Sequence, residues 1–124
     1  MDEPSFAYRK LIVYQKSRSY VKSIYLLTKE YPAEERFALC NQLRRAAVSI
    51  TSNIAEGLSR FSDKDKVHFL EIAFGSLHET MSQLEISLDL DYISLEDFNN
   101  MERQVLDISK MLSGLRKTYQ SRIG

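Results

Sequence analysis

The sequence predicts an all-α protein, an antiparallel up-down-up-down four-helix bundle that forms a single domain over residues 1–124. Two observations lead to this prediction. Apolar residues recur at alternating spacings of three and four along four long stretches, which is the period of an α-helix. Only 2 Pro and 4 Gly interrupt the chain, mostly where a helical pattern has to stop. Because the segments between these stretches are short, consecutive helices should pack side by side and antiparallel.

The first helix is predicted over residues 7–30, and it has two apolar stripes. The first stripe consists of Val13, Tyr20, Ile24, Leu27 and Tyr31, and the second of Leu11, Tyr14, Val21 and Tyr25. Together they cover a wider arc than one packed neighbour requires. We therefore expect the second stripe to contact another subunit of a homo-oligomer.

The second helix is predicted over residues 34–58. Pro32 ends the first helix and can precede the next. Glu34 and Glu35 follow it, and acidic side chains are favourable near the positive N-terminal end of a helix dipole. The core side of this helix carries Leu39, Leu43, Ala47, Ile50, Ile54 and Gly57. Gly57 offers a place for the chain to bend or for another helix to come close.

The third and fourth helices, predicted over residues 63–90 and 95–119, each begin after a serine that can cap them, Ser62 and Ser94. Their seams repeat at three and four: Val67, Leu70, Phe74, Leu77, Met81, Leu84 and Leu88, then Phe98, Met101, Val105, Ile108, Leu112, Leu115 and Tyr119. A glycine inside a helix costs about 1 kcal/mol relative to alanine, so Gly75, next to Ser76, predicts a close helix–helix contact.

Composition and spacing argue against several classes of function. No apolar run approaches the ~18 residues that cross a bilayer, and the N-terminus lacks a leader pattern, so we expect a cytoplasmic protein without a membrane partner. Cys40 is the only cysteine, which excludes an internal disulfide. No Glu-x-x-His pair is present, and His68 and His78 lie off the core seam.

We therefore predict no catalytic residues, no metal, no cofactor and no small-molecule substrate. An enzyme using Glu56, Glu71 or His78 is the least favoured hypothesis.

The flank beside the core stripe of the second helix is a polar ladder, consisting of Gln42, Arg45, Ser49, Asn53, Glu56 and Arg60. One interpretation is a hydrogen-bonded seam within or between subunits, formed by Gln42, Ser49, Asn53 and Glu56 with Gly57. The other is a basic patch for phosphates, formed by Arg44, Arg45, Arg60, Lys64 and Lys66. Both interpretations stay open at this point.

Charge is uneven along a chain whose net charge is zero. Residues 1–31 carry six Lys or Arg against three acids, and residues 67–110 carry two against nine. The C-terminal segment adds Arg116, Lys117 and Arg122 without an acid. The surface is therefore polarised, and the protein is not a general polyanion binder.

Several of these residues form a recognisable pattern: Tyr31-Pro32-x-x-Glu35, Gln42-Leu43-Arg44-Arg45-Ala46-Ala47, Asn53-Ile54-Ala55-Glu56-Gly57 and His68-Phe69-Leu70-x-Ile72-Ala73. The chain resembles the 23S ribosomal RNA intervening sequence proteins, a family of four-helix bundles. The resemblance implies a homo-oligomeric ring, typically a pentamer, and suggests association with RNA. A related branch, the accessory variability determinant of diversity-generating retroelements, binds a reverse transcriptase and nucleic acid through a basic ring.

Two functions follow as expectations. The first is a non-enzymatic scaffold or adaptor, a homo-oligomer and by the resemblance a pentamer, that associates with structured RNA through Arg44, Arg45, Arg60, Lys64 and the basic C-terminal segment. The alternative is an adaptor for a protein partner, such as a polymerase or reverse transcriptase, with no direct nucleic-acid role.

Overall fold

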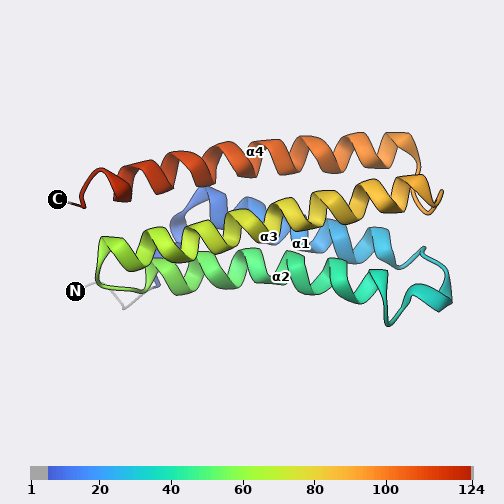
Figure 1. Cartoon of the computed structure of the whole chain (residues 1–124), viewed down its shortest axis with the longest axis horizontal. Helices are drawn as coiled ribbons and strands as arrows, with labels where there is room; N and C mark the ends of the chain where they lie inside the picture. The colour runs from blue at the N-terminus through green and yellow to red at the C-terminus, as the bar shows by residue number, and fades with distance from the viewer. Residues whose placement is uncertain (1–5, 124) are drawn as a thin grey trace.

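The computed structural model describes residues 6–123 and shows four long helices (Figure 1). These are α1 (Ile12–Thr28), α2 (Leu39–Leu58), α3 (Asp63–Asp89) and α4 (Leu95–Gln120), with two short 3-10 helices, η1 (Ala7–Lys10) and η2 (Ala33–Glu35). Each long helix runs antiparallel to the one before it, and α1 packs against both α2 and α4 (Figure 1). The predicted all-α four-helix bundle is confirmed.

The predicted starts of the first two helices were wrong. Residues 7–10 form η1, and Leu11, with φ −73° and ψ 129°, separates them from α1. Likewise α2 begins at Leu39 instead of residue 34, because η2 and a non-helical Ala38 intervene. No side chain caps either start, and α2 becomes helical at its first buried residues, Leu39 and Cys40. Glu34 and Glu35 consequently belong to η2 and not to the first turn of α2.

The starts of α3 and α4 agree with the prediction. The Ser62 side chain accepts a hydrogen bond from the Asp65 amide at 3.1 Å, and the Ser94 side chain accepts one from the Asp97 amide at 3.0 Å. Such caps are typically worth about 1 kcal/mol each. The turn between the two helices uses Asp91, which adopts a left-handed conformation with φ 60°.

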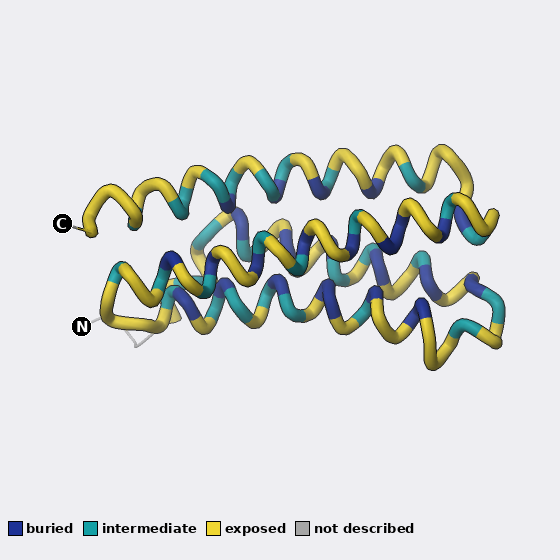
Figure 2. Tube along the Cα trace, viewed as in Figure 1, coloured by how far each residue is buried: buried dark blue, intermediate teal, exposed yellow. Residues whose placement is uncertain are grey.

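Buried residues line the inner side of every helix (Figure 2). The largest fully buried side chains are Tyr20, Ile24, Leu43, Ile50, Ile54, Leu70, Leu77, Leu84, Ile108 and Leu112. One polar bond crosses this core, since the Tyr20 hydroxyl lies 2.8 Å from Thr80 Oγ1 and so ties α1 to α3. Burial raises the pKa of Tyr20 to about 12, so the hydroxyl stays neutral in the core.

Small residues allow α2 and α3 to approach each other closely at two places. Ser49 Oγ and Ser76 Oγ lie 2.9 Å apart across the seam between these helices. At Gly57, an added Cβ would lie 2.8 Å from the Cβ of Phe69, so the predicted close approach of another helix is confirmed. The prediction at Gly75 was wrong for the described residues, because a Cβ there meets nothing within 4 Å. Ser76, one position further round α3, makes the close contact instead.

The two glycines provide a matched test of this seam. We expect Gly57→Ala to lower the free energy of unfolding by about 1 to 3 kcal/mol, because Phe69 and the α3 backbone would have to move. Gly75→Ala should raise it by about 0.5 to 1 kcal/mol, because alanine favours the helix and meets no neighbour. Urea denaturation followed by circular dichroism measures both, and effects of equal sign would contradict the described packing.

Candidate nucleic-acid interface

Antiparallel packing sorts the charged residues into two halves along the bundle. When each helix is divided at its midpoint, the half that contains the α2–α3 loop comprises residues 6–19, 49–75 and 108–123, and it carries 11 Lys or Arg against 4 Asp or Glu. The other half, residues 20–48 and 76–107, carries 6 against 11. We call them the basic half and the acidic half. Although the net charge is zero, the separation of these charges gives the bundle a strong dipole along its long axis.

The α2–α3 loop carries an exposed aromatic residue, Phe61, directly after the cation Arg60 in the sequence. Phe61 is fully exposed at the tip of this loop. Beside it, the Arg60 guanidinium lies 4.8 Å from the centroid of the Phe69 ring and 2.5 Å from the Glu56 carboxylate. Both partners of this ion pair are about half exposed, so it contributes little stability and can open toward another anion.

The C-terminal turns of α4 bring a second aromatic residue to the same end (Figure 1). The Tyr119 ring lies 5.1 Å from the Arg122 guanidinium and 5.9 Å from Lys66 Nζ. Lys66 Nζ also donates to the Arg60 carbonyl, which connects the loop to α4. We define the basic-aromatic cluster as Arg60, Phe61, Lys64, Lys66, Tyr119 and Arg122. Cations interleaved with aromatic rings are typical of surfaces that bind single-stranded nucleic acid.

Sequence reasoning missed both aromatic members of this cluster. Tyr119 was assigned only to the apolar seam of the fourth helix, whereas its ring is half-buried and contacts two cations. Phe61 was not considered, although an aromatic residue directly after Arg60 and just before Lys64 and Lys66 was an available signal.

The structure does not bring the four predicted phosphate-binding residues together. Arg60 and Lys64 belong to the basic-aromatic cluster, but Arg45 lies 15 residues earlier on α2, about 22 Å away along the helix axis. Arg45 is exposed between two shallow hollows. One, of about 370 Å³, is also lined by Ser76 and Glu79 of α3, and the other, of about 650 Å³, by residues of α1 and α2.

Arg44 is held by the C-terminal end of α1. Its Nε donates to Thr28 Oγ1 at 2.9 Å, and its Nη2 donates to the Tyr25 carbonyl at 3.5 Å. The guanidinium also lies 4.6 Å from the centroid of the Tyr25 ring. A cation is favourable beside the carbonyls that end a helix. These contacts give Arg44 a place in the packing of α1 on α2.

The polar ladder of α2 separates into a seam and an exposed ion pair. Asn53 Nδ2 donates to the Ser49 carbonyl at 2.8 Å and to Ser49 Oγ at 3.0 Å, and Ser49 in turn contacts Ser76 of α3. Of the other members, Gln42 is exposed, Glu56 pairs with Arg60, and the adjacent Gly57 is buried.

The second apolar stripe of α1 is only partly available to another subunit. Leu11, Tyr14 and Val21 are half-buried and pack against the bundle's own core. Tyr25 is 38% exposed and lines the larger hollow together with Val48 of α2. The stripe and this hollow lie on the α1–α2 side of the molecule.

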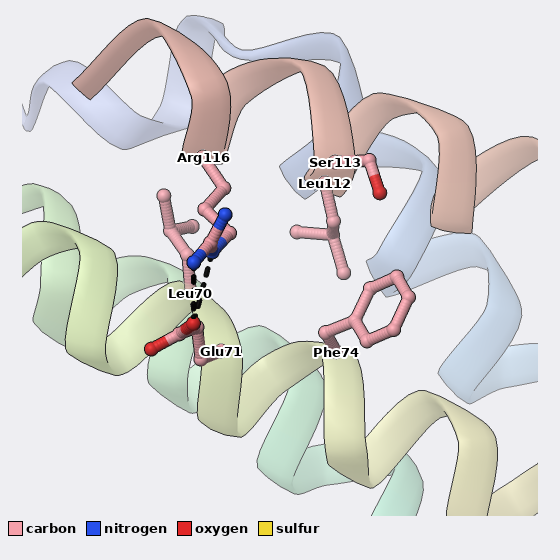
Figure 3. Close-up of a pocket in the computed structure, with 6 residues that line it drawn as sticks. All are labelled: Leu70, Glu71, Phe74, Leu112, Ser113 and Arg116. Carbon is pink, nitrogen blue, oxygen red and sulfur yellow. Dashed lines mark hydrogen bonds and ion pairs between the residues drawn. The ribbon is translucent and has the colours of Figure 1, made fainter. Parts of the chain in front are cut away.

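A groove of about 320 Å³ lies between α3 and α4 (Figure 3). Leu70, Phe74 and Leu112 form its apolar lining, and Arg116 reaches across it to Glu71 (Figure 3). The Arg116 Nη2 and Nε atoms lie 2.8 and 2.9 Å from Glu71 Oε2. Arg116 and Glu71 thus bridge this groove, and we assign Arg116 to the groove and not to the basic-aromatic cluster.

A metal site, a reactive thiol and a membrane-spanning helix were also considered for residues 6–123. No group of three or more His, Cys, Asp or Glu side chains there is placed to hold a metal ion. Cys40 is buried, and burial raises the pKa of its thiol, which disfavours the reactive thiolate. None of the described helices combines the length and apolar character that a bilayer crossing requires.

Comparison with known proteins places the bundle in a family. The family model described as 23S rRNA-intervening sequence protein matches residues 9–114. The chain belongs to this family. The crystal structure of a protein with unknown function from the S23 ribosomal protein family of Bacteroides thetaiotaomicron is similar, with a TM-score of 0.79 and 29% sequence identity. The similarity covers 86% of this chain and 99% of that one.

No curated protein matches the chain. The family match ends before Tyr119 and Arg122, so the part of the basic-aromatic cluster at the C-terminal end of the chain lies outside the matched region.

Alanine variants of Arg44 and Arg45 test which of these two adjacent side chains stabilises the fold. We expect Arg44→Ala to lower the free energy of unfolding by about 1 to 2 kcal/mol, because Thr28 and the Tyr25 carbonyl lose a charged donor. Arg45→Ala, its matched control, should change it by less than about 0.5 kcal/mol because that side chain is exposed. Urea denaturation measures both, and an equal loss in the two variants would argue against the role given to Arg44.

Proposed function

We propose that this protein is a non-enzymatic, homo-oligomeric helical scaffold that associates with structured RNA through the basic-aromatic cluster. The observation that carries the proposal is made at the basic end of a bundle whose net charge is zero, where Arg60 contacts the Phe69 ring and both Lys66 and Arg122 contact the Tyr119 ring. The name of the family, which refers to intervening sequences of 23S rRNA, supports it.

The chemistry of the cluster indicates which kind of RNA would fit. Lys64, Lys66 and Arg122 offer cations to phosphates, and this electrostatic attraction depends on salt. Phe61 is fully exposed and offers a ring on which an unpaired base can stack. A helical RNA with a loop or bulge presents phosphates and an unpaired base side by side. The acidic half repels the same RNA, so the dipole directs it to one end of the bundle.

Separate variants distinguish the two kinds of contact. Lys64→Gln/Arg122→Gln should weaken binding and reduce the slope of log K against log salt by about 1.5, because two phosphate contacts are lost. Phe61→Ala should weaken binding about 5-fold to 100-fold without changing that slope, because stacking is not ionic. Fluorescence anisotropy with a stem-loop RNA at several salt concentrations measures both effects.

The control for these titrations is Lys29→Gln/Arg36→Gln, which removes two exposed cations of the acidic half. It should leave affinity and salt slope unchanged. Equal losses in the control and the cluster variants would show binding by overall charge alone, and absence of binding at low salt would refute the RNA proposal.

For the homo-oligomer, we propose that the α1–α2 side is the lateral interface between subunits. Its support is the partly available stripe Leu11, Tyr14, Val21 and Tyr25, which adjoins the exposed Val48 and the hollow between α1 and α2. A ring of five subunits is the arrangement that the family resemblance implies. Such a ring would repeat the basic-aromatic cluster on one face, which gives multivalent contact with a single RNA.

Charge placed on this side should prevent assembly. We expect Tyr25→Glu/Val48→Glu to convert the oligomer into monomers while helical content is retained, because both side chains are exposed in the single subunit. Leu106→Glu, at an exposed leucine of α4, is the matched control and should leave the oligomer intact. Multi-angle light scattering measures the mass, and a monomeric wild-type protein at micromolar concentration would contradict the proposal.

A second candidate function is an adaptor for a protein partner, such as a polymerase or reverse transcriptase, with no direct nucleic-acid role. The acidic half favours it, because 11 acids against 6 cations suit a basic protein surface. This candidate becomes the better one if the RNA titrations fail at low salt.

A further inference from the structure

The two ends of the bundle have opposite charge and are both tipped with exposed apolar side chains. The acidic end comprises residues 29–37 and 89–97, with seven acids against Lys29 and Arg36. The basic end comprises residues 59–66 and 116–123, with six Lys or Arg against Asp63 and Asp65. These segments lie at opposite ends of the long axis, right and left in Figure 1.

The charges of the acidic end are not neutralised by neighbours. Among the described residues, none of its seven acids takes part in an ion pair. At the basic end, Arg60 and Arg116 pair with Glu56 and Glu71, whereas Lys64, Lys117 and Arg122 form no ion pair with a described residue. Both ends thus retain charge for an outside partner.

Exposed apolar side chains accompany these charges. Phe37 is 86% exposed beside the acids of η2, and Leu90 and Leu95 are half exposed or more on the α3–α4 loop and the start of α4. Phe61 and Ile123 project from the basic end. Large apolar residues surrounded by charge are typical of surfaces that bind a partner.

We propose that the basic end of one copy of this chain docks on the acidic end of a second copy. The occupant is a second copy because the complementary charge and the complementary apolar tips are present on the same molecule, at the two ends of an axis about 40 Å long. Docking pairs Lys64, Lys117 and Arg122 with the acids of η2 and the α3–α4 loop. It also buries Phe61 and Phe37.

Such a contact joins two different surfaces, so it does not close on itself and leads to an open stack. It uses none of the residues of the proposed lateral interface, so bundles or rings can stack without losing side-to-side contacts. Because its charges are exposed, the contact weakens as salt rises.

Variants in which the charge of one end is reversed test the proposed docking, and the experiment uses protein free of nucleic acid. The acid-reversed variant is Glu34→Lys/Glu35→Lys/Asp89→Lys, and the base-reversed variant is Lys64→Glu/Lys117→Glu/Arg122→Glu. Wild-type protein should gain mass with concentration at about 20 mM salt and lose that gain at about 0.5 M salt, measured by sedimentation velocity.

Each variant alone should show no such gain, because its two ends then carry the same sign. An equimolar mixture of the two variants should recover it. The control, Arg103→Glu/Lys110→Glu, changes two exposed cations of α4 away from both ends and from the proposed lateral interface, and it should behave as wild type.

A wild-type mass independent of concentration and salt would overturn the proposal, as would a mixture of helical variants that fails to associate. The outcome is separable from the RNA proposal, because wild-type protein titrated below the concentration at which it stacks keeps the whole basic-aromatic cluster. Its affinity for a stem-loop RNA therefore tests RNA binding even if stacking fails.

Discussion

The close contact of α2 and α3 is the constraint on which the candidate site depends. Gly57 allows the Cβ of Phe69 to approach the α2 backbone, and the Ser49–Ser76 pair keeps the helices close further along. With the helices so close, a loop of four residues suffices to join them. A connection this short cannot fold back over the core, so Phe61 projects from the end of the bundle. The same contact places the Phe69 ring under the Arg60 guanidinium.

Topology, rather than composition, produces the charge pattern. The acids concentrated between residues 67 and 110 fall mainly in the second half of α3 and the first half of α4, and antiparallel packing places these halves side by side. The same packing unites the α2–α3 loop, the start of α3 and the C-terminal end of the chain, which together carry Arg60, Lys64, Lys66, Arg116, Lys117 and Arg122. A parallel arrangement of the same helices would mix the two groups. Net charge and segment charge therefore give little information until the direction of each helix is known.

The parts predicted correctly from sequence are those that local rules determine. The seams of α3 and α4 and their serine caps depend on residues three or four positions apart, and the structure follows them. The starts of α1 and α2 lack such caps, so contacts with the core decide where they begin. Arg44 and Arg45 are the same residue type, so the sequence does not show which of them is structural. The difference comes from α1, because its residue Thr28, 16 positions before Arg44, accepts a hydrogen bond from Arg44 and leaves Arg45 exposed. Exposure of Phe61 likewise depends on the shape of a loop.

The proposed RNA binding and the proposed end-to-end association would draw on the same cations, and this sharing would have a physical consequence. Lys64 and Arg122 cannot contact phosphates and the acidic end of another copy at once. An RNA helix presents a denser row of negative charge than a few carboxylates do, and its binding releases condensed counterions. RNA should therefore displace a docked copy from the basic end, whereas the acidic end of the RNA-bound molecule remains open to the basic end of a free one. A stack would then end at the RNA and grow in one direction only, with the polarity of the bundle determining which end meets the nucleic acid.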